Sequence, residues 1–125
     1  MILVDTSIWV VSTRHKDGPE AKELGDLIDR DEVATTDVVI AEVLQGTANE
    51  AEFTLYKDKL SALHYFHSDR STWERAAQLS FDLRRRGLPT PLADLVIATV
   101  ALDNGLSVYA RDDHFGRIPG LTLHP

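Results

Sequence analysis

The chain has 125 residues, of which 43% are hydrophobic and 26% charged, so we expect one globular domain over residues 1–125 and not a disordered or fibrous chain. The absence of cysteine excludes disulfide scaffolds, thiolate zinc sites and cysteine nucleophiles. The net charge of −7 argues against a nucleic-acid partner, although carboxylates that bind a cation would reverse the local sign of the charge.

Two patterns alternate along the chain: short apolar runs typical of buried strands, and longer segments with apolar residues at helical spacing. In chain order they predict a strand at 2–4, helices at 8–11 and 20–29, a strand at 32–35, helices at 38–46 and 50–63, a strand at 64–67, helices at 71–86 and 92–103, a strand at 106–110 and a fifth short strand at 121–123. Residues 12–19 are expected to form a loop. The alternation indicates an α/β fold, with a parallel sheet of four to five strands covered by helices on both faces.

Capping residues set the expected helix boundaries. Asp37 is expected to cap the helix that follows it, and residues 71–74 (Ser-Thr-Trp-Glu) have the pattern of a capping box. Thr90 is predicted as an N-cap with Pro91 at the first helical position, and Gly105 as the residue that ends the same helix.

The N-terminal segment lacks the apolar pattern typical of a targeting signal. Its longest apolar run is 8–11, and Asp5 interrupts the apolar stretch 1–11. We therefore expect neither a signal peptide nor a membrane span, and a cytoplasmic location.

Four carboxylates lie at positions that need explaining. Asp5 follows the first predicted strand and Asp112 follows the fourth, at the edge of a parallel sheet where sites form. Glu42 and Asp94 share helical faces with apolar residues, where an ionised carboxylate is unfavourable without a positive partner. Each has a structural interpretation by itself: a helix cap, a turn residue, or a buried acid that is hydrogen-bonded or protonated.

Together the four acids favour a hard divalent cation. The chain has four lysines, none of them beside these positions, and Arg111 is the only adjacent basic residue. Carboxylate and water oxygens suit Mg²⁺ or Mn²⁺. Zinc is disfavoured, because there is no cysteine and no helical histidine pair, and His114 is interpreted only as a neighbour of the fourth acid.

Four blocks of this sequence resemble the PIN-domain signature: residues 2–7 (ILVDTS), Glu42 with Gly46, residues 91–98 (PLADLVIA) and residues 111–115 (RDDHF). With the chain length, they resemble the VapC-type toxins of bacterial toxin–antitoxin pairs, over essentially the whole chain. The resemblance implies a three-layer α/β/α sandwich and a Mg²⁺- or Mn²⁺-dependent endoribonuclease (a hydrolase). It also implies a homodimer and a VapB-like antitoxin partner.

The resemblance also implies roles for individual residues. The family's acidic catalytic and metal-binding positions match Asp5, Glu42, Asp94 and Asp112, and its supporting positions match Thr6 and Ser7. We expect Asp113 to project away from the site and to support the short segment 114–118. Ala110 stands where the family commonly has Thr or Ser, which removes one hydroxyl near the site.

Basic residues that could contact RNA are few. The dense run is 84–86, and its simplest interpretation is that cations complement the dipole at a helix C-terminus. Contact of Arg85 or Arg86 with the RNA backbone is a minority interpretation, as is contact of Arg14 or Lys16 in the loop after the first helix.

Three other classes of protein share some of these features. A phosphoacceptor receiver domain needs paired acids after the first strand and a lysine after a late strand, but here Thr6 and Ser7 follow Asp5. A haloacid-dehalogenase-type phosphatase needs an aspartate where this chain has Ser7. A catalytically silent PIN-like module that binds RNA or protein is disfavoured by the presence of all four acids, but stays an alternative.

Overall fold

Four short parallel strands form the central sheet of the computed structural model, which describes residues 1–125. In chain order they are β1 (Ile2–Val4), β2 (Val33–Thr36), β3 (His64–Phe66) and β4 (Ser107–Tyr109). Their order in the sheet is β3-β2-β1-β4, and every pair is parallel. The carboxyl ends of all four strands therefore meet at one edge of the sheet.

The fifth predicted strand is present only as a single bridge. Leu123 pairs with Val108 of β4, and backbone hydrogen bonds of 2.9 and 2.8 Å join Val108 to Thr122 and His124. The chain therefore touches the outer edge of β4 at one point and does not extend the sheet.

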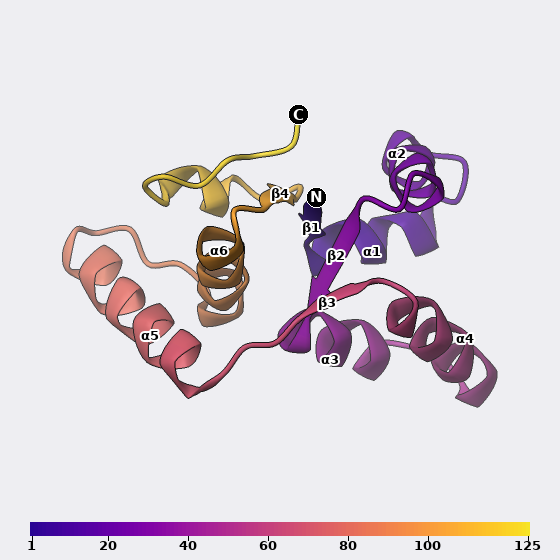
Figure 1. Ribbon diagram of the computed structural model, residues 1–125, viewed down its shortest axis with the longest axis horizontal. Coiled ribbons are helices and arrows are strands. Elements are labelled where there is room, and N and C mark those ends of the chain that lie inside the picture. The colour runs from indigo at the N-terminus through magenta and orange to yellow at the C-terminus, as the bar shows by residue number, and fades with distance from the viewer.

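Helices lie on both sides of the sheet, as the alternating pattern predicts (Figure 1). They are α1 (Thr6–Arg14), α2 (Pro19–Asp29), α3 (Asp37–Gln45), α4 (Glu50–Ser61), α5 (Arg70–Arg85), α6 (Leu92–Asn104) and the short 3-10 helix η1 (Asp113–Arg117). Helices α1 to α4 gather on one side in Figure 1, and α5 and α6 on the other. The observed architecture is thus the expected α/β/α sandwich. No helix combines the length and the apolar character needed to span a bilayer.

Helix α6 is a buried helix of the hydrophobic core. Residues 95–101 of this helix are buried without a break, as are all three residues of β1. The helix ends where the sequence predicts, at Gly105, which has a left-handed backbone with φ 64°. Because α6 is held so firmly, the position of Asp94 in its first turn is fixed by the core.

Helix α1 is longer than predicted, because residues 12–14 continue the helix and do not form a loop. Thr13 Oγ1 donates to the Trp9 carbonyl oxygen at 3.0 Å and lies 2.9 Å from the Tyr56 hydroxyl of α4. A polar run such as this one is typical of a loop in the sequence, although its side chains can contact a neighbouring helix and the run can be helical.

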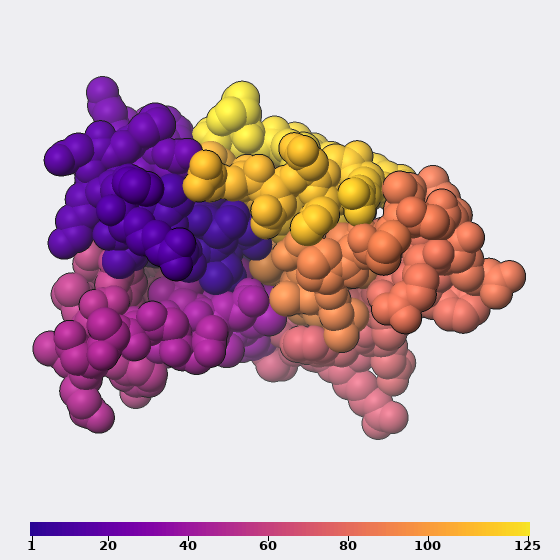
Figure 2. Space-filling model, turned by 180° about the vertical axis from the view of Figure 1, so that it is seen from behind, coloured from indigo at the N-terminus to yellow at the C-terminus, as the bar shows by residue number.

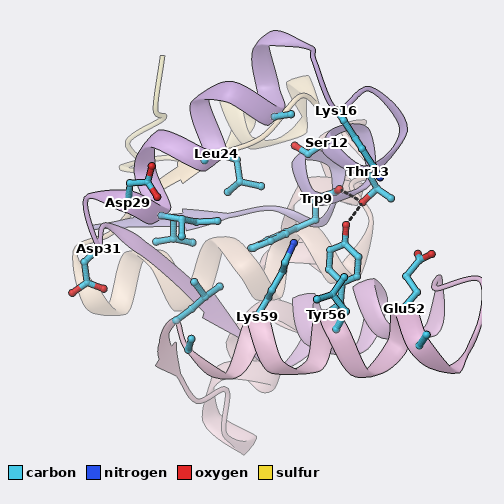
Figure 3. Close-up of a pocket in the computed structure, with 18 residues that line it drawn as sticks. Trp9, Ser12, Thr13, Lys16, Leu24, Asp29, Asp31, Glu52, Tyr56 and Lys59 are labelled. Carbon is cyan, nitrogen blue, oxygen red and sulfur yellow. Dashed lines mark hydrogen bonds between the residues drawn. The ribbon is translucent and has the colours of Figure 1, made fainter.

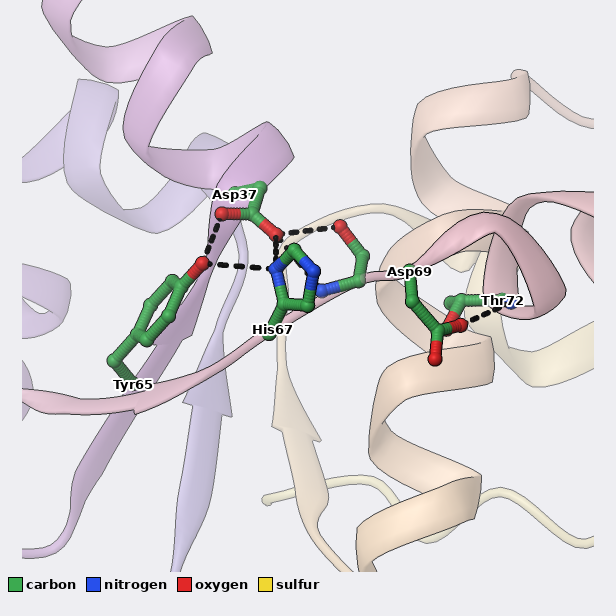
Figure 4. A network of polar contacts seen from close by, with 6 residues as sticks. Asp37, Tyr65, His67, Asp69 and Thr72 are labelled. Atoms are coloured by element: carbon green, nitrogen blue, oxygen red, sulfur yellow. Dashed lines mark hydrogen bonds and ion pairs between the residues drawn. The ribbon is translucent and has the colours of Figure 1, made fainter.

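Asp37 does not cap α3 as predicted. Thr36 occupies the N-cap position and Asp37 is the first helical residue. The Asp37 carboxylate instead accepts hydrogen bonds from the Tyr65 hydroxyl, from Ser68 N and Oγ (both 2.8 Å) and from His67 Nδ1 (3.1 Å), as Figure 4 shows. Partial burial by itself would raise the pKa of Asp37, but the hydrogen bonds from Tyr65 and Ser68 lower it below the ordinary 3.8.

Two further cap predictions are wrong by one or two residues. Helix α5 begins at Arg70, and Asp69 caps it by accepting from Thr72 N at 3.0 Å, so the capping box at 71–74 lies inside the helix. Helix α6 has Pro91 at its N-cap position, and Thr90 Oγ1 donates to the Leu88 carbonyl oxygen at 3.1 Å. Asp69 therefore supplies the side-chain cap of α5, whereas no side-chain cap hydrogen bond is made at the start of α6.

Candidate metal centre

The four predicted acids come from four different elements. Asp5 follows β1 directly, and Asp112 lies just beyond β4, whose Tyr109 is paired with Val4. Asp5 N also donates to the Tyr109 carbonyl oxygen at 2.9 Å. Parallel pairing of β1 and β4 therefore delivers both acids to the same edge of the sheet, whereas Asp94 and Glu42 arrive on α6 and α3.

The tightest cluster of potential ligands consists of Asp94, Asp112 and His114. One ligand atom from each lies within 4.8 Å of the other two. His114 Nδ1 is 2.8 Å from Asp94 Oδ2. Asp113 lies in η1 with an exposed side chain and is outside this cluster. The carboxylate oxygens of Asp94 and Asp112 and the ring nitrogen of His114 together form a set of ligands that fits a divalent cation.

His114 is the residue that sequence analysis missed. It is two positions after Asp112, and nothing in that spacing indicates that both side chains face Asp94, which lies 20 residues earlier. The turn of η1 creates the contact, with Phe115 buried in the core beside it. The only signal available in the sequence was the proximity of a histidine to the fourth acid.

Asp5 is buried, with 3% of its surface exposed. Its Oδ2 accepts hydrogen bonds from Ser7 N at 3.1 Å and from Ser7 Oγ at 2.5 Å. Burial raises the pKa of Asp5 above 3.8, the hydrogen bonds from Ser7 oppose the rise, and the negative charges of Asp94 and Asp112 add to it. The protein therefore holds Asp5 in the field of two further carboxylates.

Asp94 is in a similar electrostatic situation. Burial raises the pKa of this carboxyl, contact with His114 lowers it and the charge of Asp112 raises it again, so that the net direction is upward. The adjacent cation, Arg111, does not relieve this repulsion, since its guanidinium pairs with Glu20 at 3.6 Å. A bound cation would relieve it.

Glu42 is connected to the site indirectly. It is half-buried on α3, and its Oε1 accepts a hydrogen bond of 2.8 Å from Thr6 Oγ1. Neither Glu42 nor Asp5 belongs to the group of three converging ligand atoms. The start of α1 holds both of them, because Thr6 binds Glu42 and Ser7 binds Asp5.

Of the four predicted RNA contacts, Arg14 shares a hollow with Asp112, and Lys16 lines a neighbouring hollow. A hollow of about 440 Å³ next to Asp112 is lined by Ser7, Arg14 and Arg111 among others. Lys16 lines a neighbouring hollow with the same two arginines. Figure 2 shows the segment after β4 lying against the N-terminal segment here, where Arg111 N donates to Ser7 Oγ at 3.2 Å.

Arg85 and Arg86 are exposed at the end of α5. The Arg85 guanidinium lies over the Phe81 ring, 5.3 Å from its centroid. Neither arginine lines a hollow beside Asp112. Their position agrees with the simpler interpretation, in which they complement the dipole at the end of a helix.

The largest cavity is separate from the acids. It has a volume of about 1030 Å³ and lies among α1, α2 and α4 (Figure 3). Trp9, Leu24 and Tyr56 point into it, and none of the four acids lines it. The carboxylates that line this cavity, Asp29, Asp31 and Glu52, do not converge as potential ligands, so the candidate metal centre is the acidic cluster.

Comparison with known proteins establishes the family. The PIN domain profile matches residues 2–121, so the chain belongs to the PIN domain family. Ribonuclease VapC18 of Mycobacterium tuberculosis is 29% identical and aligns with 98% of this chain and 90% of its own length. Ribonuclease VapC11 of the same organism is 28% identical, with coverage of 98% and 94%.

Solved structures agree with this assignment. The DNA-bound VapBC complex of Salmonella typhimurium contains a chain that superimposes with a TM-score of 0.81 at 23% identity, covering 98% of this chain and 96% of that one. Mycobacterium tuberculosis VapC20, described as a sarcin-ricin loop cleaving toxin, has a TM-score of 0.74 at 20% identity, with complete coverage of both chains. The expected PIN-like fold and the resemblance to VapC-type proteins are thus confirmed.

Proposed function

We propose that this PIN domain, spanning residues 1–125, is a metal-dependent endoribonuclease and the toxin of a toxin–antitoxin pair. The observation that carries the proposal is the convergence of Asp94, Asp112 and His114 within 4.8 Å, beside the buried Asp5. The relatives named ribonucleases support the substrate class, since they align over nearly the full length of the chain.

The residues present suit Mg²⁺ or Mn²⁺. Asp5, Asp94 and Asp112 would hold the cation, since a bound positive charge would relieve their mutual repulsion. When bound, such an ion supplies Lewis acidity toward the phosphodiester and lowers the pKa of a water molecule.

The chain's own residues have distinct parts in the hydrolysis. Ser7 fixes one oxygen of Asp5, and Thr6 fixes one oxygen of Glu42, which leaves the second oxygen of Glu42 to orient the attacking water and accept its proton. The water oxygen bonds to phosphorus as the bond to the 3′ oxygen breaks, and that oxygen takes up a proton. The products are a 5′-phosphate and a 3′-hydroxyl.

The basic side chains beside the cluster support the RNA. Arg14 lines the hollow beside Asp112 and Lys16 lines the neighbouring one, where they would meet the phosphates that flank the scissile bond. A VapB-like antitoxin and a homodimer belong to the same proposal. The solved VapBC complexes, whose matching chains have the same fold, support the antitoxin partner.

The test is cleavage of RNA by the purified chain. Incubation with total RNA and Mn²⁺ should yield fragments ending in 5′-phosphate, and both a chelator and Asp94→Asn should abolish them. Cleavage that persists in the chelator would contradict metal dependence. A folded wild-type protein that binds Mn²⁺ but cleaves no RNA with Mg²⁺ or Mn²⁺ would favour the silent binding module.

A further inference from the structure

We infer that His114 is itself a ligand of the cation, through Nδ1, in addition to the carboxylates that hold it. The inference rests on the proposed function, because it requires a cation at the acidic cluster. It adds a nitrogen donor to a site that the sequence describes as purely acidic.

The fold places His114 for this role. Its side chain is 34% exposed, and its Nδ1 faces Asp94 Oδ2, whose side chain is 14% exposed. The buried Phe115 anchors η1 in the core directly after it. The ring is therefore held from the protein side, while the far edge of the ring remains accessible to solvent.

The surroundings of His114 differ from those of the chain's other paired histidines. His64 contacts Asp31 at 3.0 Å, His67 contacts Asp37 at 3.1 Å and His124 contacts Glu23 at 3.1 Å, one carboxylate each. His114 alone belongs to a group in which a second carboxylate, that of Asp112, converges on the same point. Two carboxylates and a ring nitrogen that converge on one point form a ligand set, whereas one carboxylate and one histidine form a single hydrogen bond.

The 2.8 Å separation between His114 Nδ1 and Asp94 Oδ2 suits adjacent ligands of one ion. In an octahedral site with bonds of about 2.0 to 2.1 Å, neighbouring ligand atoms lie about 2.9 Å apart. The imidazole need not move to become a ligand. The neutral ring only has to carry its proton on Nε2, on the solvent side, which leaves the Nδ1 lone pair free.

A nitrogen ligand changes which ions the site prefers. Mg²⁺ takes oxygen ligands and gives up its water reluctantly, whereas first-row transition ions accept imidazole nitrogen. His114 therefore biases the site away from Mg²⁺ and toward transition ions. Without His114 the remaining ligands are oxygens only, and this bias should be lost.

The experiment measures binding of Co²⁺ and Mg²⁺, each added alone, to the full chain by calorimetry. His114→Gln should lose Co²⁺ affinity by about tenfold or more, whereas its Mg²⁺ affinity should stay within about threefold. His64→Gln is the matched control, since it removes a histidine that is paired with an aspartate and lies on β3, at the other end of the strand order from β4. Its affinities for both ions should equal those of the wild type.

Proton NMR of the Co²⁺-loaded protein gives a second readout that does not depend on measured affinities. One histidine ring should show strongly displaced signals, and these should vanish in His114→Gln and persist in His64→Gln. Co²⁺ binding with no displaced ring, or an equal loss of Co²⁺ and Mg²⁺ affinity in a folded His114→Gln, would overturn the ligand role alone. A wild type that binds neither ion would overturn this inference and the metal dependence of the proposed function together.

Discussion

Thr6 Oγ1 donates a hydrogen bond of 2.8 Å to Glu42 Oε1, across 36 positions of sequence. The next residue, Ser7, binds Asp5 through both its amide and its hydroxyl. The first turn of α1 thus orients two acids that lie on different elements. The first two residues of α1, which follow its N-cap Asp5, thus also position the candidate site.

Thr6→Val tests this positioning, because it removes the hydroxyl and keeps the shape of the side chain. We expect kcat for RNA cleavage to fall by about 10- to 100-fold, the usual effect of losing a group that orients a site residue. Thr6→Ser restores the hydroxyl and should recover most of the rate. Equal activity of the valine and serine variants would show that Glu42 does not depend on Thr6.

The acidic cluster should destabilise the protein without metal. Two carboxylates about 4 Å apart repel by about 1 to 4 kcal/mol. Beyond the larger effect of burial, the charge of Asp112 raises the pKa of both Asp5 and Asp94. In EDTA, Asp94→Asn should therefore melt about 4 °C higher than the wild type, if it relieves about 1 kcal/mol. Millimolar Mn²⁺ should raise the wild-type melting temperature and leave the variant nearly unchanged. Identical wild-type melting in EDTA and Mn²⁺ would contradict a metal site here.

Asp37 should make stability depend on pH. Its folded pKa is lowered, so its contribution is fully present above the unfolded value of 3.8 and is lost as the pH falls through the folded value. Since the side chain is 37% exposed, we expect Asp37→Asn to lower the free energy of unfolding by only about 1 kcal/mol at neutral pH. The difference should shrink in urea unfolding at about pH 3. Asp58→Asn, on the exposed face of α4, should show no such trend.

Arg14 and Arg85 provide a matched pair for RNA contact. Arg14 lines the hollow beside Asp112, whereas Arg85 lies over Phe81 at the end of α5. Arg14→Gln should weaken RNA binding by about three- to tenfold at low salt and reduce its salt dependence, since one phosphate contact is lost. Arg85→Gln should bind like the wild type. Filter binding across a salt series decides between them, and a larger loss in Arg85→Gln would contradict the placement of the RNA.

The strand and helix order could be predicted, because buried runs such as 2–4 and 95–101 carry their signal locally. Side-chain partners far apart in sequence could not. Asp37 is of a residue type that often caps helices, but its hydrogen-bond partners, on β3 and just after it, lie 28 to 31 residues away. His114 depends in the same way on an acid 20 residues earlier and on the turn of η1. The positions of the four acids could be predicted from the local sequence, whereas the side chains that contact them depend on how the chain folds.

The adjacent acids Asp112 and Asp113 test the central claim most directly. Asp112 contributes an oxygen to the cluster with Asp94 and His114, whereas Asp113 begins η1 with its side chain exposed. The two residues share charge, size and sequence context, so the effects of the same substitution can differ only through position.

The measurement is steady-state cleavage of one defined RNA at saturating Mn²⁺ by the wild type, Asp112→Asn and Asp113→Asn, each shown to be folded. Asp112→Asn should reduce the rate by at least ~100-fold, on the scale of losing a preorganised electrostatic contact. Asp113→Asn should change it by less than ~10-fold and alter stability by at most about 1 kcal/mol. An active Asp112→Asn, or an inactive Asp113→Asn, would contradict the assignment of this cluster as the catalytic centre.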